Sequence, residues 1–516
     1  LHPVELRTLD ALHLAAALRV GLDVVTYDHR MAEAAANLGV DIFAGKRRTS
    51  TRCTPTLKKR RIKILKRVRR LMKLKRAGYD MRQLYLTGLQ QYSFYGAEVV
   101  GLNTAELSTA RAQYLQLVGS PAKSSSTPLS LEVLGDPLWR QALGPFITYS
   151  TVIWKAATSS SFQQFVDLPR LGALAGPIIE RLPATWSGVA GPLGAAHQSL
   201  KRIRWSFVTP LTVRTHTGAV LALTSSSPAL IQYHLQIAWK LAVSRNASKA
   251  VGVNSDEILC NAECTKVLRG SSLGPQYRAL LRAFLTHAIW SQARLHSLGY
   301  DVDPKCTHCG QLDTIHHRLF TCPCTQPLRD TTFKQSELSW LECNPCRAVL
   351  MQGLQLLPPA LAIRPSGIGY KPLRSWTLCG RPLEEVMQGT VFTDGSFTNL
   401  GAPTWNVAAW SVVKVSQDGV LLAWASGLIG TELPNTCAAA ENVAGLAAAT
   451  VSPTVKEARS DYQGLEGLQD KPLHEVSHRA SIYAGVRRQI VGRSPTGFKV
   501  SKVRAHVDMN SPMTDG

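Results

Sequence analysis

The sequence predicts a multidomain protein with a partial α/β fragment at the N-terminus, a mostly α-helical middle and a C-terminal α/β domain built on a mixed five-stranded sheet. Its 516 residues are enough for about three or four ordinary domains. Hydrophobic residues make up 45% of the chain, which is sufficient for sizeable cores. Changes of pattern along the chain divide it into six expected segments: 1–45, 46–135, 136–300, 301–330, 331–385 and 386–516.

The first segment has alternating helical and strand patterns. DALHLAAALRVG predicts a helix that closes at Gly21, and DVVTYD predicts a short strand. A second helix ends at Gly39, and VDIF follows as another strand. This alternation predicts a parallel α/β sheet. Because two strands alone are marginal, we expect more of this domain elsewhere.

Residues 1–45 resemble the C-terminal half of a PIN-domain ribonuclease of the VapC toxin type. Asp10 opens the DALHLA helix and Asp28 ends the strand in TYDHR. The resemblance implies that these are the last two acidic metal ligands of that family. The first strand and the two earlier carboxylates have no counterpart, so we expect poor Mg²⁺ binding by this half site. The alternative is that Asp10 caps a helix and Asp28 lies in a turn.

The net charge is +23, and a surplus of this size favours a polyanionic partner. Nucleic acid is favoured over an acidic membrane surface. The chain shows no signal peptide and no run of about 18 apolar residues. We therefore expect an intracellular protein, nuclear or cytoplasmic, that is not secreted and has no transmembrane segment. Oligomeric state is left open.

The segment 46–135 begins with a polybasic helix, LKKRRIKILKRVRRLMKLKRAG. Its apolar residues are predicted to form one stripe: Ile62, Leu65, Val68 and Met72. The Lys and Arg residues on the remaining faces are expected to neutralise phosphates of a bound nucleic acid. A solvated basic helix and a membrane-surface helix are the alternatives.

The segment CTHCGQLDTIHHRLFTC has the spacing C-x2-C-x7-H-x4-C. Two thiolates on a tight turn, followed by His and Cys, can surround one Zn²⁺ tetrahedrally. The predicted ligands are Cys306, Cys309, His317 and Cys322, with His316 as a possible substitute for His317. Unliganded surface side chains are the alternative. Cys343 and Cys346 are interpreted as spare thiols.

After the predicted linker 331–385, which is Pro- and Gly-rich over 355–385, the pattern predicts the order β-β-β-α-β…β. TVFTDGSF is a strand that carries Asp394, and two strands follow around Asp418-Gly419, a hairpin signal. An Ala-rich helix carries Glu441, and the next strand ends at Asp461. A last strand precedes His506 and Asp515.

This order and spacing over residues 388–516 resemble the RNase H family. The resemblance implies that Asp394, Glu441, Asp461 and Asp515 bind Mg²⁺ (or Mn²⁺), and that His506 is a mobile histidine assisting product release. It also implies hydrolysis of the RNA strand of RNA–DNA hybrids by two-metal catalysis. Asp508 competes with Asp515, and we expect the domain to be truncated at its C-terminus. Individually, Asp394, Glu441 and Asp461 could instead serve a turn, an exposed helix face and a helix cap.

The zinc knuckle followed by this domain is similar to the C-terminal part of a non-LTR retroelement reverse transcriptase polyprotein. Segments such as QQYSFYGAEVVGLNTAELSTARAQ resemble its helical connection region. No Asp-Asp dipeptide, the hallmark of the polymerase, occurs in the sequence. The expected partners are therefore an RNA–DNA hybrid, RNA or DNA. Two alternative functions stay open: an inactive remnant that only binds nucleic acid, and a VapC-like ribonuclease.

Overall fold

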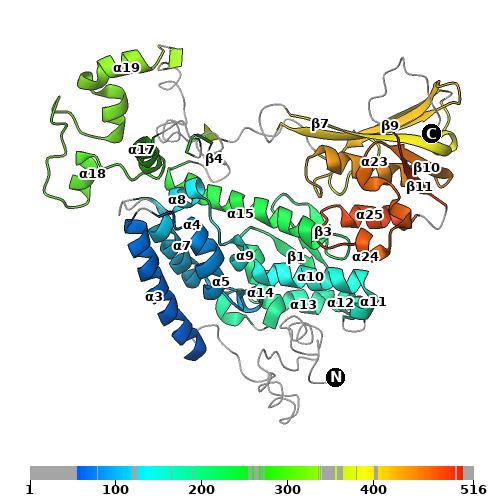
Figure 1. Cartoon of the computed structure of the whole chain (residues 1–516), viewed down its shortest axis with the longest axis horizontal. Helices are drawn as coiled ribbons and strands as arrows, with labels where there is room; N and C mark the ends of the chain where they lie inside the picture. The colour runs from blue at the N-terminus through cyan, green and yellow to red at the C-terminus, as the bar shows by residue number, and fades with distance from the viewer. Residues whose placement is uncertain are drawn as a thin grey trace, which may run out of the picture.

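The computed structural model describes residues 55–77, 79–118, 125–163, 166–189, 191–253, 259–260, 266–268, 270, 274–334, 336–337, 339, 355–356, 364–378, 380–399, 405–493 and 497–503. The predicted N-terminal fragment, with Asp10 and Asp28, lies outside the described residues. The same holds for the Cys343/Cys346 pair and for everything after 503. The described part is multidomain (Figure 1). It consists of a helical body (residues 55–253), a small Cys/His element (residues 306–322) and a C-terminal sheet domain (residues 364–503).

The helical body has its own apolar core, in which Phe146, Tyr114 and Trp205 are almost fully buried. Its helices are α3 (Pro55–Arg76), α4 (Arg82–Leu84), η3 (Tyr85–Leu89), α5 (Gln90–Ser93), α6 (Ala97–Val100), α7 (Thr104–Val118), α8 (Thr127–Leu134), α9 (Trp139–Ala142), α10 (Gly144–Thr158), α11 (Ser160–Gln163), α12 (Leu168–Ala173), α13 (Ala175–Glu180), η4 (Trp186–Gly188), α14 (Gly191–Lys201) and α15 (Pro228–Ala250). The body also contains a small antiparallel sheet that the sequence analysis did not predict. Its strands are β1 (Ser206–Thr209), β2 (Thr212–Arg214) and β3 (Val220–Ala222).

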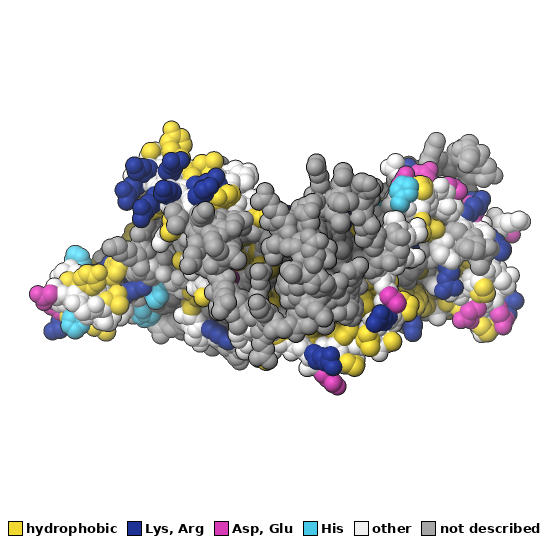
Figure 2. All heavy atoms as spheres, turned by 90° about the horizontal axis from the view of Figure 1, so that it is seen from below, with side chains coloured by type: hydrophobic (Ala, Val, Ile, Leu, Met, Phe, Trp, Pro, Cys, Tyr) yellow, Lys and Arg dark blue, Asp and Glu magenta, His cyan; other side chains and the backbone are white. Residues whose placement is uncertain are grey.

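Helix α3 is the predicted polybasic helix, but its buried stripe differs from the prediction. Ile64 and Val68 are buried, and Leu71 and Met72 pack beside them. Leu65 is 51% exposed, so its predicted place in the stripe is wrong. The observed spacing of four, three and one residues follows the 3.6-residue helical period. Seen from below, Lys and Arg side chains gather at the end of the molecule where α3 lies (Figure 2).

The connecting region holds the short helices around the Cys/His element. These are α17 (Pro275–Leu285), α18 (Gln292–Ser297), η5 (His317–Thr321), η6 (Pro323–Thr325) and α19 (Gln326–Thr332). Strands β4 (Leu259–Cys260) and β5 (Gln355–Leu356) pair with each other nearby. Among the helices that the structure describes, none combines the length and apolar character needed to cross a membrane.

The C-terminal domain is built on a mixed sheet of six strands in the order β11-β10-β7-β8-β9-β6. Its strands are β6 (Arg374–Thr377), β7 (Gly389–Thr398), β8 (Val407–Val415), β9 (Leu421–Leu428), β10 (Val455–Ser460) and β11 (Lys499–Lys502). Strand β7 pairs parallel with β10 and antiparallel with β8. The prediction of five strands is wrong by one, because β6 lies in the predicted linker. Its residues are mostly exposed, so no alternation of apolar and polar side chains marks it as a strand.

Helix α23 (Cys437–Val451) covers one face of this sheet and packs on β7, β8 and β10. Its alanines are buried, and their small side chains let the helix lie close to the strands. Helices α24 (Leu473–Val476) and α25 (Ala484–Val491) lie on the side of α23 away from the strands (Figure 1). The short helices η7 (Gln463–Leu465) and η8 (Leu468–Asp470) come between β10 and α24 in the chain. The short α22 (Leu383–Val386) lies before β7.

Candidate functional site

Three acidic side chains from separate elements meet at one edge of the C-terminal sheet. Asp394 is on β7, Glu441 is on α23, and Asp461 directly follows β10. Each offers a carboxylate oxygen, and these atoms lie within 4.8 Å of one another. The parallel pairing of Thr393 with Ser460 brings the two residues that follow, Asp394 and Asp461, to the same level of adjacent strands.

Gly395 permits the close contact between β7 and α23. A Cβ at this position would lie 2.4 Å from the backbone N of Glu441 and 2.7 Å from the carbonyl carbon of Ala440. Instead, the Gly395 N–H donates a 2.9 Å hydrogen bond to Oε1 of Glu441. The missing side chain therefore lets α23 lie close to β7, and the backbone N–H of Gly395 orients the Glu441 carboxyl group.

Glu441 is only 5% exposed, and its Oε2 has no hydrogen-bond partner. Burial, with smaller effects from nearby Asp461 and Asp394, raises the pKa of Glu441 to about 7, although hydrogen bonds from the Gly395 N–H and the Ser460 hydroxyl oppose the shift. Clustered carboxylates repel one another, and a bound cation relieves that repulsion. Hard divalent cations such as Mg²⁺ and Mn²⁺ take carboxylate oxygens as ligands. An unpaired buried oxygen beside two accessible carboxylates fits such an ion.

Cys437 lies one helical turn before Glu441 and was not predicted as part of this site. Its Sγ donates to the Gly395 carbonyl oxygen at 3.1 Å. Burial, followed by the charges of Glu441, Asp394 and Asp461, raises the pKa of this thiol. The i,i+4 spacing to Glu441 was a signal from which its position could have been found.

Two of the predicted residues of this site, Asp515 and His506, lie outside the described residues, and so does the competing Asp508. The structure therefore brings together Asp394, Glu441 and Asp461.

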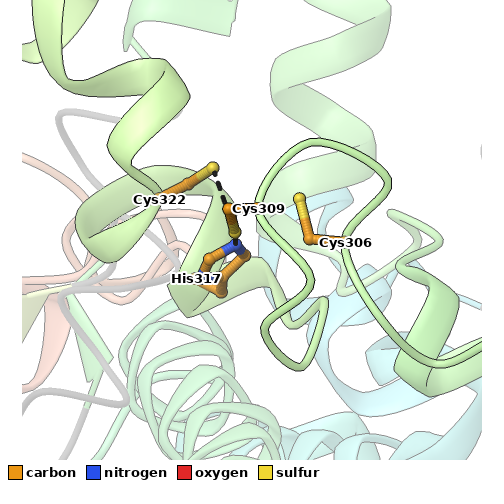
Figure 3. Close-up of side chains that lie close together, drawn as sticks. All are labelled: Cys306, Cys309, His317 and Cys322. Atoms are coloured by element: carbon orange, nitrogen blue, oxygen red, sulfur yellow. Dashed lines mark hydrogen bonds between the residues drawn. The ribbon is translucent and has the colours of Figure 1, made fainter.

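The second cluster joins Cys306, Cys309, His317 and Cys322 (Figure 3). One donor atom from each lies within 4.8 Å of the others. Nε2 of His317 is 3.1 Å from Sγ of Cys309, and the Sγ atoms of Cys309 and Cys322 are 3.9 Å apart. The first two cysteines lie on a turn that closes at Gly310, whose φ of 73° suits glycine. This donor set fits the closed tetrahedral shell of a structural Zn²⁺.

The structure distinguishes between the two adjacent histidines. His317 is buried in the cluster, and its Nδ1 lies 3.3 Å from the Thr321 hydroxyl, a contact that orients the ring. The His316 ring is instead 5.6 Å from the ring of Phe320. Cys324 is exposed and is not one of the four grouped residues.

Local polar contacts support the cluster. Backbone N–H groups of His308 and Cys309 lower the pKa of the Cys306 thiol, which favours the thiolate that a metal binds. Asp313, 2% exposed, accepts hydrogen bonds from Arg318 Nε at 2.7 Å and from the backbone N of Gln292 at 2.7 Å. The carboxylate thus ties the Cys/His element to the start of α18.

A curated protein, Ribonuclease VapC46 of Mycobacterium tuberculosis (strain ATCC 25618 / H37Rv), is 56% identical to this chain over 45 residues. The match covers 8% of this chain and 35% of the relative, so the chain spans about a third of that protein's length. The relative is of the VapC type, which is the type of ribonuclease that residues 1–45 were found to resemble. No family model and no solved structure matches the chain. The RNase H and retroelement resemblances therefore rest on the residues themselves.

Proposed function

We propose that the C-terminal domain is a divalent-metal-dependent endonuclease of RNase H type, which hydrolyses the RNA strand of RNA–DNA hybrids. The convergence of Asp394, Glu441 and Asp461 within 4.8 Å carries this proposal. The unpaired, buried Oε2 of Glu441 supports it, because an orphaned carboxylate oxygen is costly unless a cation or donor compensates it.

Each residue has a definite part in the proposed chemistry. Asp394, Glu441 and Asp461 would hold Mg²⁺ or Mn²⁺, and Gly395 orients Glu441 through its N–H. When bound, a pair of such ions neutralises charge on the attacking and leaving oxygens of a phosphodiester. Hybrid preference would come from contacts to 2′-hydroxyl groups and from a second strand that fits only as DNA.

Two further regions support a nucleic-acid substrate within a retroelement-derived protein. The exposed Lys and Arg residues of α3 can neutralise phosphates without regard to sequence. The Cys/His element, with zinc in place, would add a second contact region beyond the sheet domain. Both parts would hold the strand that the carboxylates cut.

The test is cleavage of an end-labelled RNA–DNA hybrid in Mg²⁺. Asp394→Asn is expected to lower the cleavage rate by at least about 100-fold, since one ligand of the ions is lost. Asp418→Asn, in the exposed turn between β8 and β9, is the matched control and is expected to cut at the wild-type rate. Equal cleavage by Asp394→Asn and wild type would remove the mechanism. Salt-sensitive binding with no metal-dependent turnover would instead identify a binding remnant.

The match to Ribonuclease VapC46 favours a second candidate, a ribonuclease acting on single-stranded RNA through Asp10 and Asp28. The double variant Asp10→Asn/Asp28→Asn separates the two. If this variant loses cleavage of single-stranded RNA but retains cleavage of the hybrid, the single-strand activity belongs to the N-terminal residues.

A further inference from the structure

Arg487 on α25 contacts the helix that carries Glu441. Its Nε donates a 3.0 Å hydrogen bond to Oδ1 of Asn442, the residue that follows Glu441. Asn442 is fully buried, and its Nδ2 donates to the Ala438 carbonyl at 2.7 Å, which fixes the amide orientation. The guanidinium group therefore binds one rigid point on α23, adjacent to the carboxylate cluster.

The same guanidinium group lies against the segment that follows Asp461. A Cβ at Gly464 would be 2.8 Å from Nη2 of Arg487 and 2.5 Å from Cε1 of Tyr462. Gly464 belongs to η7, which begins directly after Tyr462. The guanidinium carbon is also 6.0 Å from the centre of the Tyr483 ring. Arg487 thus hydrogen-bonds to the helix that carries Glu441 and lies close to the segment that follows Asp461.

Helix α25 and the segment before it are docked on the helical body. Arg488 Nη2 donates to the Ala157 carbonyl at 2.7 Å, and the Ser227 hydroxyl donates to the Ser481 carbonyl at 2.7 Å. A Cβ at Gly485 would lie 1.9 Å from the Ser225 carbonyl oxygen.

Two further contacts extend this dock. The Trp154 Nε1–H donates to the Ser477 carbonyl at 3.3 Å. Leu230, in the first turn of α15, belongs to the apolar core of the C-terminal domain. Side-chain hydrogen bonds to backbone carbonyl groups and the close approach at Gly485 therefore hold α25 and the segment before it against the helical body.

We infer that Arg487 is a positioning residue for the carboxylate cluster and that the helical body holds it in place through α25; this inference rests on the proposed function. A guanidinium group is a planar, rigid donor, so its hydrogen bond to Asn442 and its packing beside Gly464 restrain α23 and the segment after Asp461 relative to each other. Groups behind the ligands orient them, and their loss typically weakens metal binding by about 10–100-fold. The docked body makes metal binding in the C-terminal domain depend on residues of another domain.

The experiment measures Mn²⁺ affinity by electron paramagnetic resonance on the full chain, loaded beforehand with one equivalent of Zn²⁺. Arg487→Gln is expected to weaken Mn²⁺ binding by about 10-fold. Arg487→Lys is expected to lose less, because the ammonium group can still donate to Asn442 although the packing of the guanidinium group beside Gly464 is lost. Arg479→Gln, which removes an exposed arginine from the docking segment, is the matched control and is expected to bind Mn²⁺ as wild type does.

The docking half of the inference is tested with Arg488→Gln, which removes the hydrogen bond to Ala157. Like Arg487→Gln, this variant is expected to bind Mn²⁺ more weakly than wild type. The melting temperature of each variant is measured as well. A lower melting temperature with unchanged Mn²⁺ affinity in both the Arg487 and Arg488 variants would reduce these residues to a structural role and overturn the inference. If Arg487→Gln shows no cooperative unfolding, Arg487→Lys carries the same comparison.

Glu441→Gln separates this inference from the proposed function. If Glu441→Gln loses Mn²⁺ binding while Arg487→Gln keeps it, the inference is wrong and the proposed site stands. If Glu441→Gln binds Mn²⁺ as wild type does, the proposed site itself is wrong.

Discussion

The backbone N–H of Gly395 on β7 donates to Oε1 of Glu441 on α23 at 2.9 Å, while Oε2 of the same carboxyl group stays buried without a partner. One oxygen of Glu441 is thus fixed by the sheet, and a carboxylate oxygen of Glu441 lies within 4.8 Å of one from Asp394 and one from Asp461. This single contact couples the packing of α23 on the sheet to the chemistry of the cluster.

Gly395→Ala is expected to lower the free energy of unfolding by about 1–3 kcal/mol, because the new Cβ would overlap the backbone at Glu441 and force α23 outward. Urea denaturation measures the change. Gly88→Ala is the matched control, since a Cβ there meets nothing within 4 Å. Gly88→Ala is expected to keep or raise the stability, because alanine is favoured over glycine in a helix. Equal stability losses at both positions would exclude the contact with α23 as the cause.

His317→Ala is expected to lose bound zinc, since Nε2 of His317 lies in the cluster 3.1 Å from Cys309 Sγ. His316→Ala is expected to keep its zinc, because that ring packs beside Phe320. Zinc content by mass spectrometry of the purified variants measures both. The reverse pattern would mean that His316 is the ligand.

Cys324→Ser provides a control for loss of any nearby thiol. Its exposed Sγ lies outside the four grouped residues, and zinc content is expected to match that of wild type.

The triple variant Lys66→Gln/Arg70→Gln/Lys73→Gln, on the exposed face of α3, is expected to weaken nucleic-acid binding. If all three side chains contact phosphates of a duplex, the slope of log K against log salt falls by up to about 2.7. Fluorescence anisotropy at several salt concentrations measures the slope. The charge-preserving triple Lys66→Arg/Arg70→Lys/Lys73→Arg is expected to bind as wild type does. An unchanged slope in the glutamine variant would place α3 outside the interface.

Glu132 on α8 gives the stability a defined pH dependence. Burial raises its pKa to about 7, although the Ser244 hydroxyl opposes the shift. The unfolded state, with a pKa near 4.5, ionises first as the pH rises. Stability from this group is therefore present below pH 4.5 and decreases toward pH 7, by up to about 3 kcal/mol.

Glu132→Gln is accordingly expected to stabilise the protein at pH 8 and to leave it unchanged at pH 4.5, as measured by urea denaturation at both values. Glu466→Gln, at an exposed position, controls for the loss of one formal charge. A gain of equal size at both pH values would exclude ionisation of Glu132 as the cause.

The grouping of the four Cys and His side chains could be predicted because they lie in one short stretch, 306–322, where spacing alone limits the geometry. Only the choice between His316 and His317 needed the structure, since adjacent residues on a helical turn point in different directions. The order of the strands and the helix after residue 388 could also be predicted from the periodicity of apolar residues. The edge strand β6 was not, because exposed residues carry no such periodicity.

The sequence by itself determined which acidic residues were candidates, through their places at the ends of strands and on an apolar helix. Only the tertiary structure decided that Asp394, Glu441 and Asp461 meet, because strand register and the height of α23 depend on long-range pairing. The tertiary structure also placed Cys437 and Arg487 close to this cluster. For Arg487, no local sequence pattern indicates the proposed positioning role. The hydrogen bond from Arg487 to Asn442 and the contacts of α25 with the helical body form only when distant segments pack together.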